Sequence, residues 1–260
     1  MNEQIPHHDE FLSFANGLAD IARTMIQSAA LGDHSIEIKK DHSFVTKTDR
    51  KIERELRKKI EQKYPQHGIL GEEYGNQKLD AEFVWVLDPI DGTAPFIAGI
   101  PVFGSLIALA WKGSPFLGII EQPITADRWV GVANRFALFN ERPAHVRPCE
   151  NLKDAFVTCS NPDFMDRDQQ FSLERLKRKT SYTQYGGACF AYGSLASGRT
   201  DIAIDAGLKA FDLFAPAAVI TGAGGIISDW AGESLTIDLE GDVLAAGDKR
   251  LHEAVLLLVN

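Results

Sequence analysis

The sequence predicts an α+β fold in which helices and strands pack as layers. Two amphipathic helical patterns come first, and short apolar runs bounded by turn residues begin at Phe83. Helices and strands then mix without the strict β-α-β alternation of a doubly wound sheet. The 260 residues, 45% of them hydrophobic, can bury a sizeable core, and this length corresponds to one large domain or two small ones.

Two helices are expected near the N-terminus. The first covers residues 10–30, where apolar side chains recur at three- and four-residue spacing: Phe11, Phe14, Leu18, Ile21, Ala22 and Met25. The second helix follows Asp49 and carries Ile52, Leu56 and Ile60 on one face. The run Arg50–Glu55 alternates in charge, which is typical of a helix face in contact with solvent.

Strands are expected where short apolar runs lie between Gly, Pro or Asp residues. These runs are Phe83–Leu87, Phe103–Ala110, Phe116–Ile120, Trp129–Ala133, Ala155–Cys159 and Thr200–Ile204. Later helices are expected over Gln169–Lys179 and Asp212–Thr221. Gly222, Gly224 and Gly225 follow the last helix rather than opening one after a strand. They therefore predict a helix end and a turn, not a dinucleotide-binding loop.

The charge of the chain narrows the classes of partner. A formal net charge of −9 disfavours direct binding to nucleic acid, and it repels a phosphorylated substrate unless a bound metal supplies positive charge. The first residues have no signal-peptide pattern, and no apolar run is long enough to span a membrane. The three cysteines suit neither a disulfide framework nor a zinc site, so the chain is expected to be cytoplasmic.

The segment Trp85–Thr93 carries the most informative acids. A strand leads directly into Asp88 and Asp91, and Gly92 permits a tight turn before a short helix that is expected to run through Thr93. The two carboxylates project into the same space, which is unfavourable unless a cation lies between them, and such oxygen ligands suit Mg²⁺. The backbone amides of Gly92 and Thr93 are then free to meet an anion. Taken alone, the segment is also compatible with an ordinary turn.

Three further acids lie in short motifs elsewhere in the chain. Glu72 follows an apolar pair and Gly71, 16 residues before Asp88. Asp49 lies at the start of the second helix, and Asp212 lies at the start of a late helix. Taken alone, Asp49 and Asp212 are each compatible with a helix cap.

Together these motifs resemble, in order and spacing, those of the inositol monophosphatase superfamily. The matching pieces are Val45–Asp49, Gly71–Glu73, Asp88–Thr93 and a late segment with Phe211-Asp212, Gly224-Gly225 and Asp229. The resemblance covers nearly the whole chain and implies a layered αβαβα sandwich of the inositol monophosphatase and fructose-bisphosphatase type. It also implies one phosphatase unit over residues 1–260, with a metal-binding half over about 1–145 and a smaller half over about 146–260 that completes the site.

The resemblance implies a lithium-sensitive phosphomonoesterase that depends on two to three Mg²⁺ ions. In this family pattern, the first ion is held by Glu72, Asp88 and the backbone carbonyl of Ile90. The second ion is held by Asp88, Asp91 and Asp212, and a third, weaker ion depends on Glu72. Two such ions suit the activation of an attacking water and the stabilisation of a leaving alkoxide.

The resemblance also implies catalytic and substrate-binding residues. Thr93 together with Asp49 takes a proton from the attacking water, so the candidate catalytic residues are Asp49, Glu72 and Thr93. The candidate substrate-binding residues are Asp91, Gly92, Thr93, Gly187, Ala188, Asp205 and Asp212. For Asp205 an acid in a turn at a strand end is the alternative interpretation.

Within the superfamily, the chain is most similar to bacterial histidinol-phosphate phosphatases. The stretches that carry this similarity are Gly99–Leu109, Leu117–Pro123, Arg128–Gly131, Tyr185–Tyr192 and Asp205–Lys209. Histidinol phosphate is therefore the expected substrate, with inositol-1-phosphate or a broad range of sugar and polyol phosphates as alternatives. The chain departs from this subgroup at Ala188, where aspartate is usual, and at Ala94, where arginine is usual.

A regulatory role is the alternative from a different class, because some superfamily members bind transcription or translation machinery. The acids favour catalysis over a pure scaffold, which has no need for mutually repelling carboxylates. A homodimer is expected at the level of the family, with no direct contact to nucleic acid or membrane.

Overall fold

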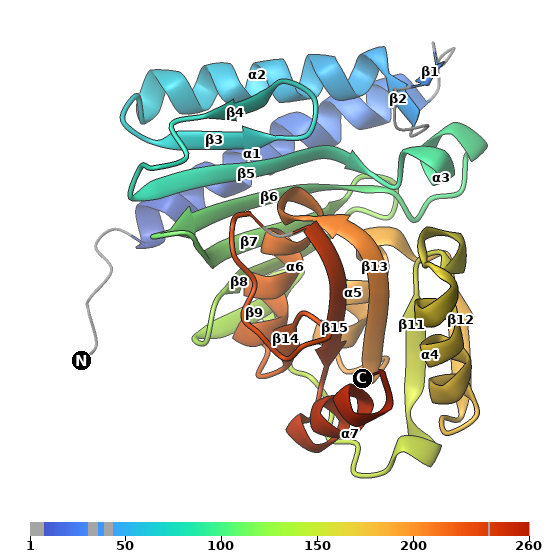
Figure 1. Ribbon diagram of the computed structural model, residues 1–260. Coiled ribbons are helices and arrows are strands. Elements are labelled where there is room, and N and C mark those ends of the chain that lie inside the picture. Colours follow the sequence, from blue (N-terminus) through green and yellow to red (C-terminus); the bar gives the residue numbers. More distant parts are fainter. Residues whose placement is uncertain (1–7, 31–35, 39–43, 239, 260) are drawn as a thin grey trace.

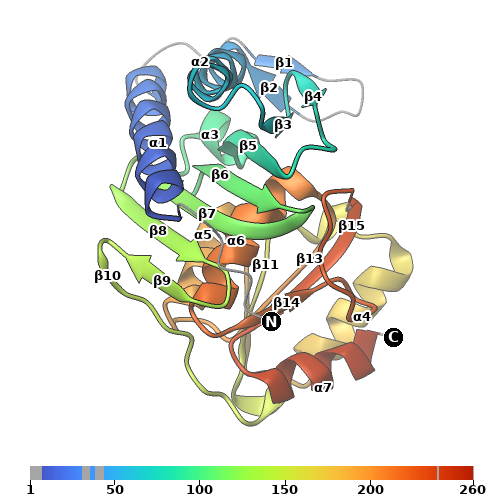
Figure 2. The same cartoon turned by 90° about the vertical axis from the view of Figure 1, so that its left-hand side faces the viewer.

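The computed structural model describes residues 8–30, 36–38, 44–238 and 240–259, which form five layers (Figures 1 and 2). Two long helices, an eight-stranded sheet, two central helices, a five-stranded sheet and two outer helices follow one another. This arrangement confirms the expected α+β fold and its αβαβα layers. No helix within the described ranges is long and apolar enough to cross a membrane.

The first layer consists of α1 (His8–Ala30) and α2 (Lys47–Lys63), which cover one face of the first sheet (Figure 2). That sheet has the order β10-β9-β8-β7-β6-β5-β3-β4, with β3 and β5 parallel and the other neighbours antiparallel. Its strands are β3 (Gly68–Gly71), β4 (Gly75–Gln77), β5 (Phe83–Asp91), β6 (Gly104–Trp111), β7 (Ser114–Gln122), β8 (Asp127–Val132), β9 (Phe136–Phe139) and β10 (Arg142–Pro143). A separate antiparallel pair, β1 (Ile36–Ile38) and β2 (Phe44–Thr46), leads into α2.

The second sheet and the remaining helices complete the layers. The sheet has the order β12-β11-β13-β15-β14, with strands β11 (Phe156–Cys159), β12 (Tyr182–Tyr185), β13 (Ile202–Lys209), β14 (Ile226–Ser228) and β15 (Glu240–Ala246). The central helices are α5 (Ala188–Ala196) and α6 (Ala210–Gly222), and the outer helices are α4 (Arg167–Lys177) and α7 (Lys249–Val259). The short helix α3 (Thr93–Ala98) follows β5, and single 3₁₀ turns span Leu152–Asp154 and Pro162–Phe164.

Apolar side chains join the layers in three clusters. One lies between the first helical layer and the first sheet and includes Leu18, Ile26, Ile52, Leu56, Trp85 and Ile107. The second surrounds the central helices and includes Leu106, Trp129, Leu195, Phe214, Ala203 and Val243. The third lies under the outer helices and includes Val157, Leu173, Leu176, Ile202, Leu244 and Val255. Because α6 contacts both sheets, it is apolar on nearly all sides.

Two glycines set the position of α6 against the first sheet. A Cβ atom at Gly118 would lie 2.3 Å from the carbonyl oxygen of Ala215, and one at Gly131 would lie 2.4 Å from the Cα of Val219. Both distances are far shorter than any van der Waals contact, so α6 can lie this close only because the strands present no side chain there. Close packing of this kind holds the middle of α6 against β7 and β8.

The expected elements are present with shifted ends, and one expectation is wrong. The strand expected over Phe83–Leu87 continues to Asp91, and the one expected over Thr200–Ile204 runs over Ile202–Lys209. The run Arg50–Glu55 is not a wholly solvated face, because the Glu53 side chain is fully buried. The sheets lie on either side of residue 145, and the division of the chain into two halves stays a prediction.

Candidate active site

An irregularity in β5 brings Asp88 and Asp91 to the same side of the sheet. Asp88 lies opposite Leu106 of β6, whereas Asp91 lies opposite Gly104, so β5 has one more residue than its partner over this interval. In a regular strand, residues three apart point to opposite faces, and one extra residue reverses that parity. The bulge therefore turns both carboxylates toward a common point at the end of β5.

Asp212 reaches the same point from the second half of the chain. It is the third residue of α6, and its Oδ2 accepts a hydrogen bond of 2.7 Å from the backbone nitrogen of Lys209. Carboxylate oxygens of Asp88, Asp91 and Asp212 all lie within 4.8 Å of one another. We call these three residues the acidic cluster.

Burial and mutual repulsion oppose ionisation of the acidic cluster. Burial raises the pKa of Asp91 to about 6, although a 2.6 Å hydrogen bond from the backbone nitrogen of Cys189 to Asp91 Oδ2 acts in the opposite direction. Burial also raises the pKa of Asp88 and of Asp212 well above the ordinary value, and the charges of Glu72 and Asp91 raise them further. A divalent cation at this point relieves this repulsion, because it favours the ionised carboxylates.

Two buried carboxylate oxygens also lack a partner. Among the described residues, Asp49 Oδ1 and Asp88 Oδ1 are buried and accept no hydrogen bond. A buried, unpaired carboxylate oxygen is costly, and coordination of a metal ion satisfies it. The donor set consists of carboxylate oxygens, which suits a hard cation such as Mg²⁺. The residues present therefore fit the expected metal.

Glu72 and Ile90 lie next to the acidic cluster. Glu72 follows β3, and its backbone nitrogen donates 3.3 Å to the carbonyl oxygen of Leu87, which places it beside the end of β5. Its charge raises the pKa of Asp88, but Glu72 is not one of the three acids that converge within 4.8 Å. The carbonyl oxygen of Ile90 accepts a 3.2 Å hydrogen bond from the Thr93 hydroxyl. Ligand roles for Glu72 and Ile90 stay predictions.

Asp49 is a buried acid in the first turn of α2. Its Oδ2 accepts hydrogen bonds from the backbone nitrogen of Thr46, at 2.9 Å, and from the Thr46 hydroxyl. Burial raises the pKa of Asp49, and the charge of Glu72 raises it further. Thr93 begins α3, which packs against β2, the strand that leads into α2. Asp49 is hydrogen-bonded to Thr46, and Thr93 is hydrogen-bonded to Ile90. Among the described residues, no hydrogen bond joins Asp49 to Thr93.

The starts of α3 and α5 meet at Gly92 and Ala188. Gly92 has φ 77°, and a Cβ atom there would lie 3.0 Å from the Cβ of Ala188. Ala188 itself has a left-handed backbone, with φ 44°. A Cβ atom at Gly187 would lie 2.8 Å from the Cβ of Ala191. The structure thus brings Gly92, Gly187 and Ala188 together beside Asp91, while their contact with a substrate stays a prediction.

Asp205 is held by other protein groups. It is 3% exposed, and its Oδ1 accepts a 2.5 Å hydrogen bond from the backbone nitrogen of Ser160. Its Oδ2 accepts from the hydroxyls of Tyr192, at 2.7 Å, and Ser160, at 3.2 Å. Both oxygens therefore have partners within the protein, and a direct contact between Asp205 and a substrate stays a prediction.

We expect Asp205→Asn to change how stability depends on pH. Burial raises the pKa of Asp205 from 3.8 to about 6, so its ionisation opposes folding. The neutral form of Asp205 contributes fully to the free energy of unfolding below about pH 4. This contribution, about 3 kcal/mol, is lost as the pH rises through about 6. Over this pH range, the free energy of unfolding of the wild type, measured with denaturant, should therefore fall relative to that of the variant.

Asp168→Asn, which changes an exposed carboxylate, is the control for that pH series. A difference between Asp205→Asn and the wild type that stays constant from about pH 4 to about pH 7 would contradict the expected titration.

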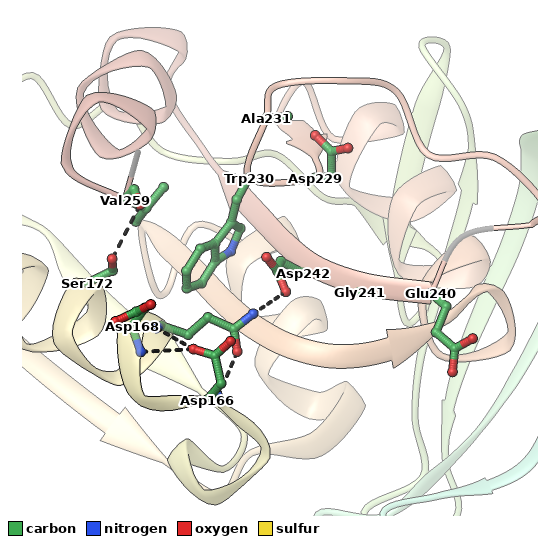
Figure 3. A pocket seen from close by; sticks show the side chains of 11 residues that line it. Asp166, Asp168, Ser172, Asp229, Trp230, Ala231, Glu240, Gly241, Asp242 and Val259 are labelled. Carbon is green, nitrogen blue, oxygen red and sulfur yellow. Dashed lines mark hydrogen bonds between the residues drawn. The ribbon is translucent and has the colours of Figure 1, made fainter.

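A separate acidic cavity of about 610 Å³ lies beside α4 and β15 (Figure 3). Its acids are Asp166, Asp168, Asp229, Glu240 and Asp242. Several of them have structural partners: Gln169 Nε2 donates 2.6 Å to Asp242 Oδ1, and Asp166 caps α4. None of the predicted site residues lines this cavity. Asp229, which belongs to the motif resemblance, is therefore outside the acidic cluster.

The chain is similar to several known proteins over nearly its whole length. A sequence model of the inositol monophosphatase family matches residues 7–260. The bifunctional phosphatase IMPL2, chloroplastic, of Arabidopsis thaliana is 39% identical, over 95% of this chain and 74% of its own length. The histidinol-phosphatase of Mycobacterium tuberculosis is 32% identical, over 97% of this chain and 98% of its own. A solved structure of an inositol monophosphatase from Zymomonas mobilis is 38% identical, with a TM-score of 0.90 over 98% of this chain and 99% of that one.

Proposed function

The chain belongs to the inositol monophosphatase family of phosphomonoesterases, and we propose that it is a Mg²⁺-dependent phosphatase whose preferred substrate is histidinol phosphate. The observation that carries this proposal is the convergence of Asp88, Asp91 and Asp212 within 4.8 Å, together with the unpartnered buried oxygen of Asp88. Such an arrangement is unfavourable by itself and becomes favourable when a divalent cation is bound.

We assign the metal ligands according to the family pattern. Asp88, Asp91 and Asp212 hold one Mg²⁺, and Glu72, Asp88 and the carbonyl of Ile90 hold another, with two to three ions in all. When bound, the ions lower the pKa of a water molecule and neutralise charge on the phosphate. The backbone contacts from Cys189 to Asp91 and from Lys209 to Asp212 hold the carboxylates in place.

Asp49 and Thr93 handle the proton of the attacking water in this proposal. Thr93 keeps its hydroxyl beside the acidic cluster through its hydrogen bond to Ile90. Asp49 offers a buried oxygen, Oδ1, that has no other hydrogen bond among the described residues. The raised pKa of Asp49 makes its carboxylate a better proton acceptor than an ordinary aspartate. The amides of Gly92 and Thr93 bind phosphate oxygens.

Sequence similarity supports histidinol phosphate as the preferred substrate. The 32% identical histidinol-phosphatase matches nearly the whole chain.

Inositol or another polyol phosphate is the second candidate. The 38% identical inositol monophosphatase supports it, and so does Ala188, which presents no charge where the leaving group is expected. Both oxygens of Asp205 are also already bonded within the protein.

A substrate panel with purified protein tests the proposed function. We expect phosphate release from histidinol phosphate, at a higher kcat/KM than from inositol-1-phosphate, sugar phosphates or a nucleotide 3′-phosphate. Release should require Mg²⁺, because the acids alone cannot neutralise the phosphate. Lithium should suppress release, as the resemblance to the family implies. Full activity in excess chelator contradicts the metal mechanism, and a higher kcat/KM for inositol-1-phosphate selects the second candidate.

The remaining expectations concern partners and location. Activity of the purified protein without added partners distinguishes an enzyme from a regulatory protein that only binds macromolecules. A homodimer and a cytoplasmic location remain proposals.

A further inference from the structure

The turn that follows β3 contains Glu72, and residues of helix α2 bind this turn. We propose that Glu53 of α2 is a positioning residue that fixes Glu72 at the acidic cluster, with Arg57 as its charge partner. This inference rests on the proposed function, in which Glu72 is a metal ligand. Glu53 itself contacts neither the acidic cluster nor a substrate in this proposal.

Glu53 binds the backbone directly after Glu72. Its side chain is fully buried, and its Oε2 accepts a 2.7 Å hydrogen bond from the backbone nitrogen of Glu73. Its Oε1 accepts a 3.2 Å bond from the backbone nitrogen of Tyr74 and a 2.7 Å bond from Arg57 Nε. The carboxylate therefore acts as an anchor for two successive amides of the turn.

Arg57 binds the other end of the same turn. It is one helical turn after Glu53, and its Nη2 donates a hydrogen bond to the carbonyl oxygen of Gly75. Since a fully buried carboxylate is stable only with a charged partner and with donors to its oxygens, the pair acts as one unit. Glu53 and Arg57 together hold both the N–H and the C=O groups of the turn over residues 73–75.

The residue before Glu72 is fixed by the same carboxylate. A Cβ atom at Gly71 would lie 2.1 Å from Glu53 Oε1 and 2.6 Å from Arg57 Nη2. With the Glu53 and Arg57 side chains in these positions, the backbone therefore has room only for glycine at position 71. Glu72 thus lies between a neighbour packed on Glu53 and a neighbour hydrogen-bonded to it, which leaves its backbone little freedom.

The same helix also carries Asp49, four residues before Glu53. Asp49 and Glu53 lie on the buried face of α2, together with Ile52, Leu56 and Ile60. Burial raises the pKa of Asp49, and the charge of Glu72 makes a smaller contribution in the same direction. Helix α2 therefore sets the position of the candidate base directly and that of Glu72 through Glu53.

Glu53→Gln tests this inference, with Glu61→Gln, an exposed glutamate of the same helix, as the matched control. Glutamine keeps the size of the side chain but replaces one carboxylate oxygen by an amide donor, which then meets the backbone donor of either Glu73 or Tyr74. We expect the dissociation constant for Mg²⁺, measured by titration calorimetry without substrate, to rise by about 10- to 100-fold. Hydrogen exchange of the Glu73 and Tyr74 amides should become faster, and the control should change neither quantity.

Kinetics separate positioning from a general loss of structure. In Glu53→Gln the Mg²⁺ concentration for half-maximal activity should rise, while kcat at saturating Mg²⁺ and KM for the phosphate ester stay near those of the wild type. A folded Glu53→Gln protein that binds Mg²⁺ as the wild type does overturns the inference. If Glu53→Gln does not fold, Arg57→Lys, which keeps the charge but not the two-point contact, decides by the same titration.

Glu72→Gln distinguishes failure of this inference from failure of the proposed function. If Glu72→Gln weakens Mg²⁺ binding and Glu53→Gln does not, only the positioning role is overturned. If Glu72→Gln leaves Mg²⁺ binding unchanged, the ligand assignment of the proposed function fails, and the positioning role fails with it.

Discussion

Asp91→Asn and Asp212→Asn are each expected to lower kcat by at least about 100-fold, the loss observed when a comparable electrostatic stabiliser is removed from an active site. Asparagine keeps the shape of the side chain and its oxygen, so the backbone contacts from Cys189 and Lys209 can persist. The negative charge that binds the cation is lost. Steady-state kinetics at saturating Mg²⁺ provide the measurement.

The fold of these variants should remain intact. Since burial and repulsion already oppose the ionised acids, removing one charge should not lower the melting temperature of the metal-free protein. Asp168→Asn, in the separate acidic cavity, is the control and should leave kcat unchanged. Near-normal turnover of Asp91→Asn or Asp212→Asn would show that the ligand assignment is incorrect.

Ala188→Asp should raise kcat/KM for histidinol phosphate by about 10- to 150-fold, the value of one charge-assisted hydrogen bond of about 1.5–3 kcal/mol that acts in the transition state. Ala188 adopts φ 44°, a conformation that aspartate tolerates better than alanine, so the start of α5 can accept the change. The new carboxylate lies at position 188, where the leaving group is expected, beside Gly92, whose amide is proposed to bind phosphate. Its repulsion from the acidic cluster offsets part of the gain.

Neutral polyol phosphates should respond differently to the same substitution. Their kcat/KM is expected to stay unchanged or to fall, because they carry no cation for the new carboxylate. Ala188→Asn, which has a similar shape and the same tolerance of a left-handed backbone, is the matched control without charge. If the wild type already prefers histidinol phosphate strongly and Ala188→Asp gives no increase, position 188 does not determine the substrate.

Local sequence patterns predicted the layered fold and the candidate metal-binding acids, but they did not predict where β5 ends. An Asp-Pro pair is typical of a turn, so the strand was expected to end at Leu87. The structure instead continues the ladder to Asp91 through a bulge, and this bulge aligns the two carboxylates. A bulge depends on the register with β6, which is a long-range property that no local pattern contains.

Glu53 illustrates a second limit of sequence reasoning. Its neighbours alternate in charge, which predicts a solvated helix face, yet its carboxylate is fully buried under the 72–75 turn. One signal was available: Asp49 and Glu53 share the helical spacing of Ile52, Leu56 and Ile60. Acids on an apolar helix face indicate either a helix cap or a buried partner. The partner of Glu53 is the turn between β3 and β4.

The approach of Asp212 to Asp88 and Asp91 depends on packing across the whole molecule. Its position follows from α6, which lies on Gly118 and Gly131 of the first sheet. No spacing in the sequence relates residue 212 to residues 88 and 91. The resemblance to the inositol monophosphatase superfamily was the reason to expect Asp212 beside Asp88 and Asp91.

The donors that hold the acids have a consequence for how the protein can evolve. Asp49, Asp91 and Asp212 each accept a hydrogen bond from a backbone nitrogen, those of Thr46, Cys189 and Lys209. A backbone nitrogen is present whatever side chain the residue carries, proline excepted. Substitutions of side chains at Lys209 and at Ala188, next to Cys189, therefore leave these backbone donors in place. The surroundings of the site can diversify by single substitutions while Asp91 and Asp212 keep the contacts that orient them.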